Sequence, residues 1–269
     1  MAIFIGRPSY AQTNLQLWQQ LQEEEYSDGE KSLVHNTYEF ARRLYSGFFI
    51  ASGRTQISHL IGTASILSSL RVPGVVVAAG LIHNIYENAD FGSCRKGCTA
   101  AKRAATRRAV GEEVERHVHH VYAWTAGRKP ISSMLSQIDA MNPVARFAIL
   151  IKICDRFEHR LNDGGLEQYK KYVDKDGPMM MESARRLGFP TLASQIQQVI
   201  AEPDPELSFF KELMNGMAES RSRWIIPMSC RKRFTVVSGA ALTRGYRRIA
   251  ATKAVSRVIR MAGVLRSSG

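Results

Sequence analysis

Two histidines and one aspartate form the group of residues in this sequence whose types and spacing suit metal chemistry. His59 lies at the start of one predicted helix, His83 lies at the end of an apolar run, and Asp155 lies on a third helix. Asp155 follows Ile151 by four residues and shares its apolar stripe, so its carboxylate points inward and needs a cation. Two imidazoles and a carboxylate suit Mn²⁺, Fe²⁺ or Zn²⁺ and leave positions open for water and a phosphate oxygen. A tightly hydrogen-bonded trio without a metal is the alternative.

The helix that must position His83 is the element around which the rest of the chain is organised. We predict that it begins near Val72, because Pro73 suits a first turn, and that it continues through residue 88. Its apolar run is shorter than the roughly 20 residues that cross a bilayer, so we expect a core helix. Gly80 lies one turn before the polar end and would let another backbone or a ligand approach closely.

Four polar side chains gather at the end of this helix. At helical spacing His83 and Glu87 share one face, and Asn84 and Asn88 form the adjoining row. Buried polar groups without partners cost about 1–3 kcal/mol each. A metal ion, a substrate or a hydrogen-bond network must therefore satisfy these side chains.

Helical periodicity recurs along the chain, and no run shows the alternation typical of a strand. The fold class that we predict is therefore all-α, with one domain over residues 1–219 and an appended tail over residues 220–269. The other predicted helices span residues 13–25, 31–46, 59–70, 99–124 (as one helix or two, with a break near Gly111), 143 to the glycines at 164–165, 166–187 with a break near Pro178, 192–200 and 206–219.

The tail over residues 220–269 is strongly basic. It holds 12 lysines and arginines and no aspartate or glutamate, whereas the rest of the chain carries a net charge of only +1. Its apolar residues recur as in a loosely amphipathic helix, so an anionic membrane surface is a predicted partner. Nucleic acid is a weaker candidate, because base stacking needs aromatic side chains and Tyr246 is the sole one after Phe234. A solubilising tail is the alternative.

The cysteines and the first residues bear on location. Four cysteines without zinc-finger spacing suit a reducing compartment, and the apolar start of the chain ends at Arg7 and Pro8, too early for a secretory leader. We therefore expect a cytoplasmic protein that associates peripherally with a membrane if the tail binds lipid.

Basic residues follow the polar cluster along the chain. Arg103 and Arg107 are four apart on the predicted helix after the loop at residues 90–99, so they share a face. Guanidinium groups bind phosphate through charge-assisted hydrogen bonds. We predict that this pair contacts a phosphorylated substrate, with a solvated helix face as the alternative.

The order of these residues resembles the H…HD…D pattern of HD-domain metal-dependent phosphohydrolases, and in particular the hydrolase domain of the alarmone (guanosine tetraphosphate) synthetase/hydrolases. A loop with Ser52 and Gly53 leads to His59, as in that family. Residues 78–88 are AAGLIHNIYEN where the family has AALLHDxxED, and residues 151–156 are IKICDR where it has IKxxDRxxN. The resemblance covers roughly residues 30–165 and implies an HD-like helical bundle.

The resemblance also implies roles, and the sequence departs from the family at four places. The basic residue expected before the Ser-Gly loop is absent, since Ile50 and Ala51 precede Ser52. Asn84 stands in place of the motif aspartate, Asn88 in place of a second acidic residue, and His159 in place of an asparagine. The implied metal ligands are His59, His83, Asn84 and Asp155. Asn84 would offer only a neutral carbonyl oxygen, so a weaker metal site is expected. Glu87 would orient or deprotonate the attacking water.

We therefore predict a divalent-metal-dependent phosphohydrolase that acts on a nucleotide or another small phosphorylated metabolite. Mn²⁺ is the favoured cofactor, with Fe²⁺ or Zn²⁺ as alternatives. The predicted substrate contacts are Asn88, Arg103 and Arg107. The alternative function is a non-catalytic HD-like module that binds a ligand or a protein partner in the same cavity.

Overall fold

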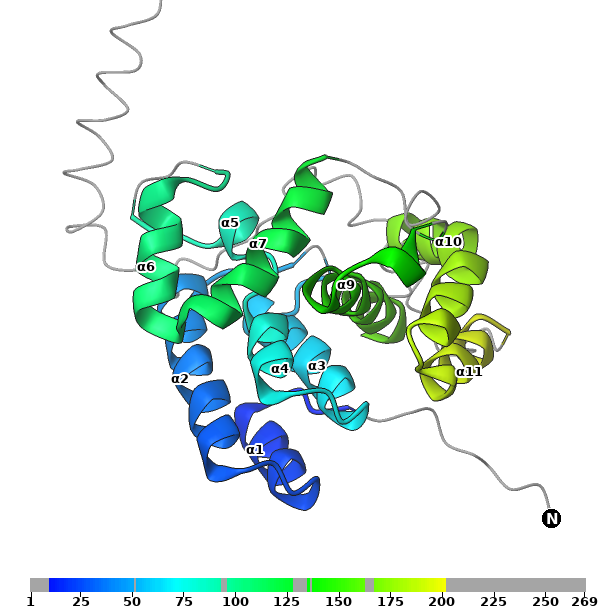
Figure 1. Ribbon diagram of the computed structural model, residues 1–269, viewed down its shortest axis with the longest axis horizontal. Helices are drawn as coiled ribbons and strands as arrows, with labels where there is room; N and C mark the ends of the chain where they lie inside the picture. Colours follow the sequence, from blue (N-terminus) through cyan, green and yellow to red (C-terminus); the bar gives the residue numbers. More distant parts are fainter. Residues whose placement is uncertain are drawn as a thin grey trace, which may run out of the picture.

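Most of the described part of this chain is helical. The computed structural model describes residues 10–50, 52–92, 96–127, 135, 137–162 and 167–201, and over these residues it contains no strand beyond one isolated bridge between Phe49 and Thr55. The helices are α1 (Asn14–Glu23), α2 (Asp28–Tyr45), α3 (Gln56–Ser69), α4 (Gly74–Leu81), α5 (Ile85–Asn88), α6 (Ala100–Val110), α7 (Glu112–Ala126), the short 3-10 helix η1 (Ile138–Ala140), α9 (Pro143–Asn162), α10 (Glu167–Arg186) and α11 (Pro190–Ala201) (Figure 1). The predicted all-α class is confirmed.

Three helices, α3, α4 and α9, hold the centre of the molecule (Figure 1). α3 packs against both α4 and α9, while α2 and α7 cover the other sides of α4. Gly80 of α4 lies against α3, where a Cβ atom would collide with Leu67 Cδ1 and would lie 3.6 Å from Ala64 Cα. The close approach predicted at Gly80 is therefore between two helix backbones.

The first turn of α3 begins earlier than predicted. Thr55 is the N-cap, and its hydroxyl accepts a hydrogen bond from the Ser58 N–H at 3.2 Å. The predicted helix start at His59 is therefore wrong by about one turn. Because His59 already lies inside the helix, its side chain points into the core with 1% of the residue exposed.

The predicted helix over residues 72–88 is also wrong, since the chain breaks between α4 and α5. Ile82 has a non-helical φ of −133°, and its N–H donates a hydrogen bond to the Ala79 carbonyl oxygen at 3.2 Å. The His83 ring contributes to the break, because its Nδ1 lies 2.8 Å from the Gly80 carbonyl oxygen. That carbonyl would accept the Asn84 N–H in an unbroken helix. His83 and Glu87 therefore do not share one continuous helix face.

Two further predictions about helix breaks have opposite outcomes. The break near Gly111 is confirmed, because this residue separates α6 from α7 and has φ of 91°, which favours glycine. The break near Pro178 is wrong, because α10 continues through it. Gly177 lies so close to α11 that a Cβ atom there would be 2.5 Å from Ile200 Cδ1. We attribute the continuity of α10 to its packing on α9 and α11.

Both the basic tail over residues 220–269 and the predicted helix over residues 206–219 lie outside the described residues. Membrane-surface binding by the tail therefore stays a prediction. Among the helices that the structure describes, none is long and apolar enough to span a membrane.

Candidate metal centre

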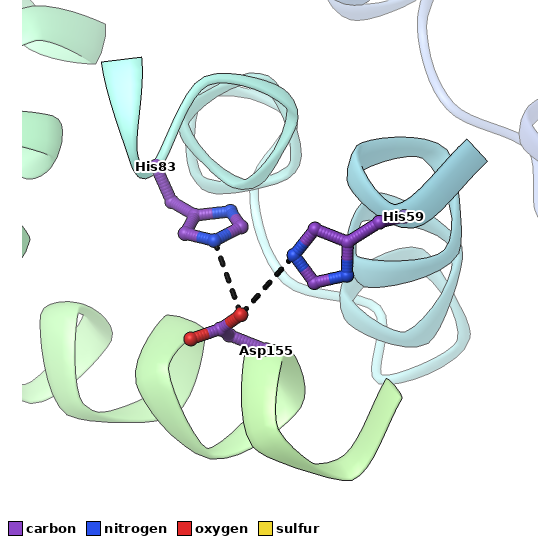
Figure 2. Close-up of side chains that lie close together, drawn as sticks. All are labelled: His59, His83 and Asp155. Carbon is purple, nitrogen blue, oxygen red and sulfur yellow. Dashed lines mark ion pairs between the residues drawn. The ribbon is translucent and has the colours of Figure 1, made fainter. Parts of the chain in front are cut away.

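His59, His83 and Asp155 converge on one point in the core. His59 comes from α3, His83 from the turn between α4 and α5, and Asp155 from α9 (Figure 2). Both imidazole Nε2 atoms lie 3.2 Å from the same carboxylate oxygen, Asp155 Oδ1. The three residues are 1%, 3% and 6% exposed, and their ligand atoms all lie within 4.8 Å of one another. The structure thus brings together the three residues that the sequence singled out.

The Nδ1 atom of each histidine ring is within hydrogen-bond distance of an oxygen. His59 Nδ1 lies 2.6 Å from Glu158 Oε2, and His83 Nδ1 donates to the Gly80 carbonyl oxygen at 2.8 Å. In a neutral imidazole these contacts place the proton on Nδ1 and leave the Nε2 lone pair facing Asp155. His59 Nε2 is buried and makes no hydrogen bond with the described part of the chain. With both imidazoles neutral, two lone pairs and a carboxylate oxygen would face one another, an arrangement that fits a divalent cation.

Glu158 of α9 supports this arrangement from behind His59. Its carboxylate is fully buried, with Arg54 Nη2 at 3.0 Å from Oε2 and with Asn162 Nδ2 donating to Oε1 at 2.9 Å. Burial opposes ionisation, but the charges and hydrogen bonds of His59 and Arg54 outweigh it and lower the pKa of Glu158. Gly62 of α3 provides the space, since a Cβ atom there would lie 2.6 Å from Glu158 Oε1. Glu158 thus orients His59 as an ionised acceptor.

Asp155 is ionised although it is buried. Burial opposes ionisation, but Lys152, His83 and His59 together hold the pKa of Asp155 well below its usual range. Lys152 Nζ donates to Oδ2 at 2.9 Å, whereas both histidines face Oδ1. The two oxygens of the carboxylate therefore have separate partners.

The protonated, positively charged form of the His59 ring is favoured. Burial lowers the pKa of His59, but the carboxylates of Glu158 and Asp155 outweigh burial and raise this pKa to about 9. A proton and a divalent cation would thus compete for Nε2. Since a metal ligand must be a neutral imidazole, metal binding at this ring would displace a proton.

Asn84, the fourth ligand implied by the resemblance, is partly committed elsewhere. Its Oδ1 accepts a hydrogen bond from the Tyr45 hydroxyl at 2.7 Å. Asn84 is half-buried and lies in the turn directly after His83. Its oxygen has two lone pairs, and the Tyr45 hydroxyl uses one of them.

Glu87 and Asn88 lie on the short helix α5, both half-buried. Burial raises the pKa of Glu87, and the nearby charge of Asp155 adds to this rise, whereas Lys152 and His83 oppose it. The charges of Lys152, His83 and Asp155 therefore all affect the pKa of Glu87. Within the described chain, the Asn88 side chain makes no hydrogen bond to those residues, so its predicted role stays a prediction.

Arg103 and Arg107 are both paired with the carboxylate of Glu115. Arg103 makes two contacts with the buried carboxylate of Glu115, from Nε to Oε1 at 2.6 Å and from Nη2 to Oε2 at 3.0 Å. Arg107 Nε contacts Oε2 at 2.9 Å, and the Tyr86 hydroxyl donates to Oε1 at 2.8 Å. The pair is held in an ion network between α6 and α7, and any phosphate contact would have to use its remaining N–H groups.

Comparison with known proteins adds one partial match. A model for a domain of unknown function, DUF6817, matches residues 42–125. No curated protein sequence matches this chain. The matched segment includes His59 and His83, whereas Asp155 and Glu158 of α9 lie beyond it. The resemblance to HD-domain hydrolases therefore stays a prediction.

Proposed function

We propose that this protein is a divalent-metal-dependent phosphohydrolase that acts on a nucleotide or another small phosphorylated metabolite. The observation that carries the proposal is the convergence of two imidazole Nε2 atoms on the ionised Asp155 at 3.2 Å each. The Nδ1 atoms of both rings are occupied by buried oxygens, so the rings are oriented as metal ligands usually are.

His59, His83 and Asp155 would hold the ion. A bound divalent ion supplies a Lewis acid and lowers the pKa of a coordinated water. Glu87 is the group that would take the proton from that water, because its raised pKa brings it closer to neutral pH than an exposed glutamate. In this proposal Glu158 keeps the His59 ring in place and Lys152 keeps Asp155 ionised.

The charge near Glu87 supports an anionic substrate. The positive charges of Lys152 and Lys96 both lower the pKa of Glu87, and Lys96 is exposed. Lysine side chains at the rim of a site attract phosphate groups and raise the local concentration of a phosphorylated ligand. Arg103 and Arg107 are secondary candidates for phosphate contacts, because Glu115 already uses part of their hydrogen-bonding capacity.

A non-catalytic binding module is the second candidate function. Two contacts favour it: Tyr45 donates to Asn84, and Lys152 donates to Asp155. Both contacts satisfy polar groups of the site without a substrate. The loss of one carboxylate at position 84 relative to the HD pattern also reduces the negative charge available to a metal.

Metal binding and phosphatase activity test the proposal in two steps. Tag-free protein is titrated with Mn²⁺, Fe²⁺ and Zn²⁺ by calorimetry and then assayed against a panel of nucleotides and sugar phosphates. We expect one ion per chain, loss of that ion in His83→Ala, and full retention in His35→Ala, which removes an exposed histidine of α2. Metal binding without phosphate release from any substrate would favour the binding module, and no metal binding would overturn both the site and the hydrolase.

A further inference from the structure

A third imidazole approaches the same carboxylate oxygen. His159 lies one turn after Asp155 on α9, and its Nε2 is 3.7 Å from Asp155 Oδ1. Its ring stacks on the His59 ring with centroids 4.1 Å apart and planes 19° apart. The Nε2 atoms of three histidines thus lie within 3.7 Å of one oxygen, although the sequence pattern pointed to only two.

We propose that His159 is the fourth ligand of the metal and takes the place that the HD pattern gives to the residue at position 84. This inference rests on the metal site of the proposed function. It changes the ligand set from two imidazoles, an amide and a carboxylate to three imidazoles and a carboxylate. It therefore also assigns a metal preference, for Zn²⁺ over Mn²⁺.

Helix geometry supports His159 as a ligand. Side chains four residues apart on a helix lie on one face with their Cβ atoms about 5–6 Å apart, and pairs at this spacing bind a single ion in known zinc motifs. Asp155 and His159 have this spacing, and the side chain of Asp155 already faces the other two histidines.

The contacts of Asn84 support the exchange. Its carbonyl oxygen accepts the Tyr45 hydroxyl at 2.7 Å, so part of its capacity as an acceptor is used. An amide oxygen is also a neutral and hard ligand, whereas imidazole is the ligand type that zinc shares with copper, iron and nickel. Replacing the amide by His159 shifts the site toward Zn²⁺, and carboxylate and carbonyl oxygens are the ligands that suit Mn²⁺.

A second ion is a separate arrangement that the same residues could adopt. His59, Glu158 and His159 also have ligand atoms within 4.8 Å of one another. An ion there would have to displace the proton between His59 Nδ1 and Glu158 Oε2, which are 2.6 Å apart. We therefore expect a single ion that uses the Nε2 side of His59.

Metal titration of tag-free His159→Asn and His159→Gln variants tests the inference, with Zn²⁺ and Mn²⁺ measured separately against a competing chelator. We expect the wild-type chain to bind one Zn²⁺. Both variants should lose at least about tenfold in Zn²⁺ affinity and much less in Mn²⁺ affinity. The visible spectrum of Co²⁺-loaded protein should also change in these variants, because one nitrogen ligand is removed. His35→Ala is the matched control, and circular dichroism verifies that each variant is folded.

The outcomes separate this inference from the proposed function. Unchanged Zn²⁺ affinity in both His159 variants, together with loss of binding in His83→Ala, would overturn the fourth ligand and leave the three-residue site standing. Two Zn²⁺ ions per wild-type chain would overturn the single four-ligand site. No binding of either metal to the wild-type chain would overturn both the inference and the proposed function.

Discussion

His59 Nδ1 lies 2.6 Å from Glu158 Oε2, and this contact determines which nitrogen of the ring faces Asp155. Glu158 is fully buried and is itself held by Arg54 and Asn162. The orientation of His59, a proposed metal ligand, thus depends on a carboxylate on the opposite side of its ring from Asp155. Changes that disturb Glu158 should reach the metal without altering a ligand.

Gly62→Ala tests this dependence. The new Cβ atom would lie 2.6 Å from Glu158 Oε1 and 2.8 Å from its Cγ, so the carboxylate must move. We expect a loss of about 1–3 kcal/mol in the free energy of unfolding and a loss of about 10–100-fold in metal affinity. Urea denaturation and metal titration measure the two effects.

Gly29→Ala is the control for that experiment, because this helical glycine in α2 has no atom within 4 Å of the added Cβ. It should leave metal affinity unchanged and leave stability unchanged or raise it slightly. If Gly62→Ala destabilised the protein but bound metal like the wild type, Glu158 would not be what orients His59.

Asn84→Asp should strengthen metal binding. An aspartate at this position still accepts the Tyr45 hydroxyl and adds one negative charge beside His83. We expect roughly a tenfold rise in Mn²⁺ affinity, since even a screened charge a few ångströms away contributes about 1 kcal/mol or more. Asn36→Asp adds the same charge at an exposed position of α2 and should have no effect. Equal affinity in the Asn84→Asp variant and the wild type would place the residue 84 side chain outside the metal's reach.

The sequence singled out Asp155 because it lies on an apolar stripe, His83 because it ends an apolar run, and His59 because it begins a predicted helix. A charged or polar side chain on an apolar stripe must find a partner in the core, and this argument needs no knowledge of the fold. Glu158 was not singled out in this way. Glu158 is followed in the sequence by His159 and Arg160, and such a polar run is typical of an exposed helix end. In the structure, however, Glu158 is fully buried against Gly62 of α3.

Two features of the structure depend on individual side-chain contacts that hydrophobic periodicity does not encode. The helix around His83 breaks where His83 Nδ1 donates to the Gly80 carbonyl oxygen, and hydrophobic periodicity does not predict that hydrogen bond. Arg103 and Arg107 share a helix face, but their spacing does not show that Glu115 of the next helix pairs with both of them. Their predicted phosphate contact stays a prediction. The turn at Gly111 folds α7 back so that the buried carboxylate meets both guanidinium groups.

Glu115→Gln should destabilise the protein through this network. Glu115 is 1% exposed and accepts hydrogen bonds from Arg103, Arg107 and Tyr86. The glutamine cannot satisfy all three donors, and a buried unsatisfied group costs about 1–3 kcal/mol. Glu39→Gln is the matched control, because its pair with Arg42 lies on the surface and exposed pairs contribute only about 0–1 kcal/mol. Urea denaturation of both variants measures the difference, and equal losses would show that the Glu115 network adds no stability beyond a surface pair.

The stabilisation by Glu115 should also depend on pH. Burial would raise the pKa of Glu115, but hydrogen bonds from Arg103, Tyr86 and Arg107 outweigh it and lower this pKa below its usual value of 4.5. A carboxyl group whose pKa is lower in the folded state contributes stability that is complete above the unfolded-state pKa and is lost as the pH falls through the folded-state pKa.

The difference in unfolding free energy between the wild type and Glu115→Gln should therefore be constant near neutral pH and should shrink as the pH falls below 4.5. Denaturation of both proteins across this range measures it. A difference that persisted well below pH 4.5 would mean that the network acts through packing rather than through the charge of Glu115.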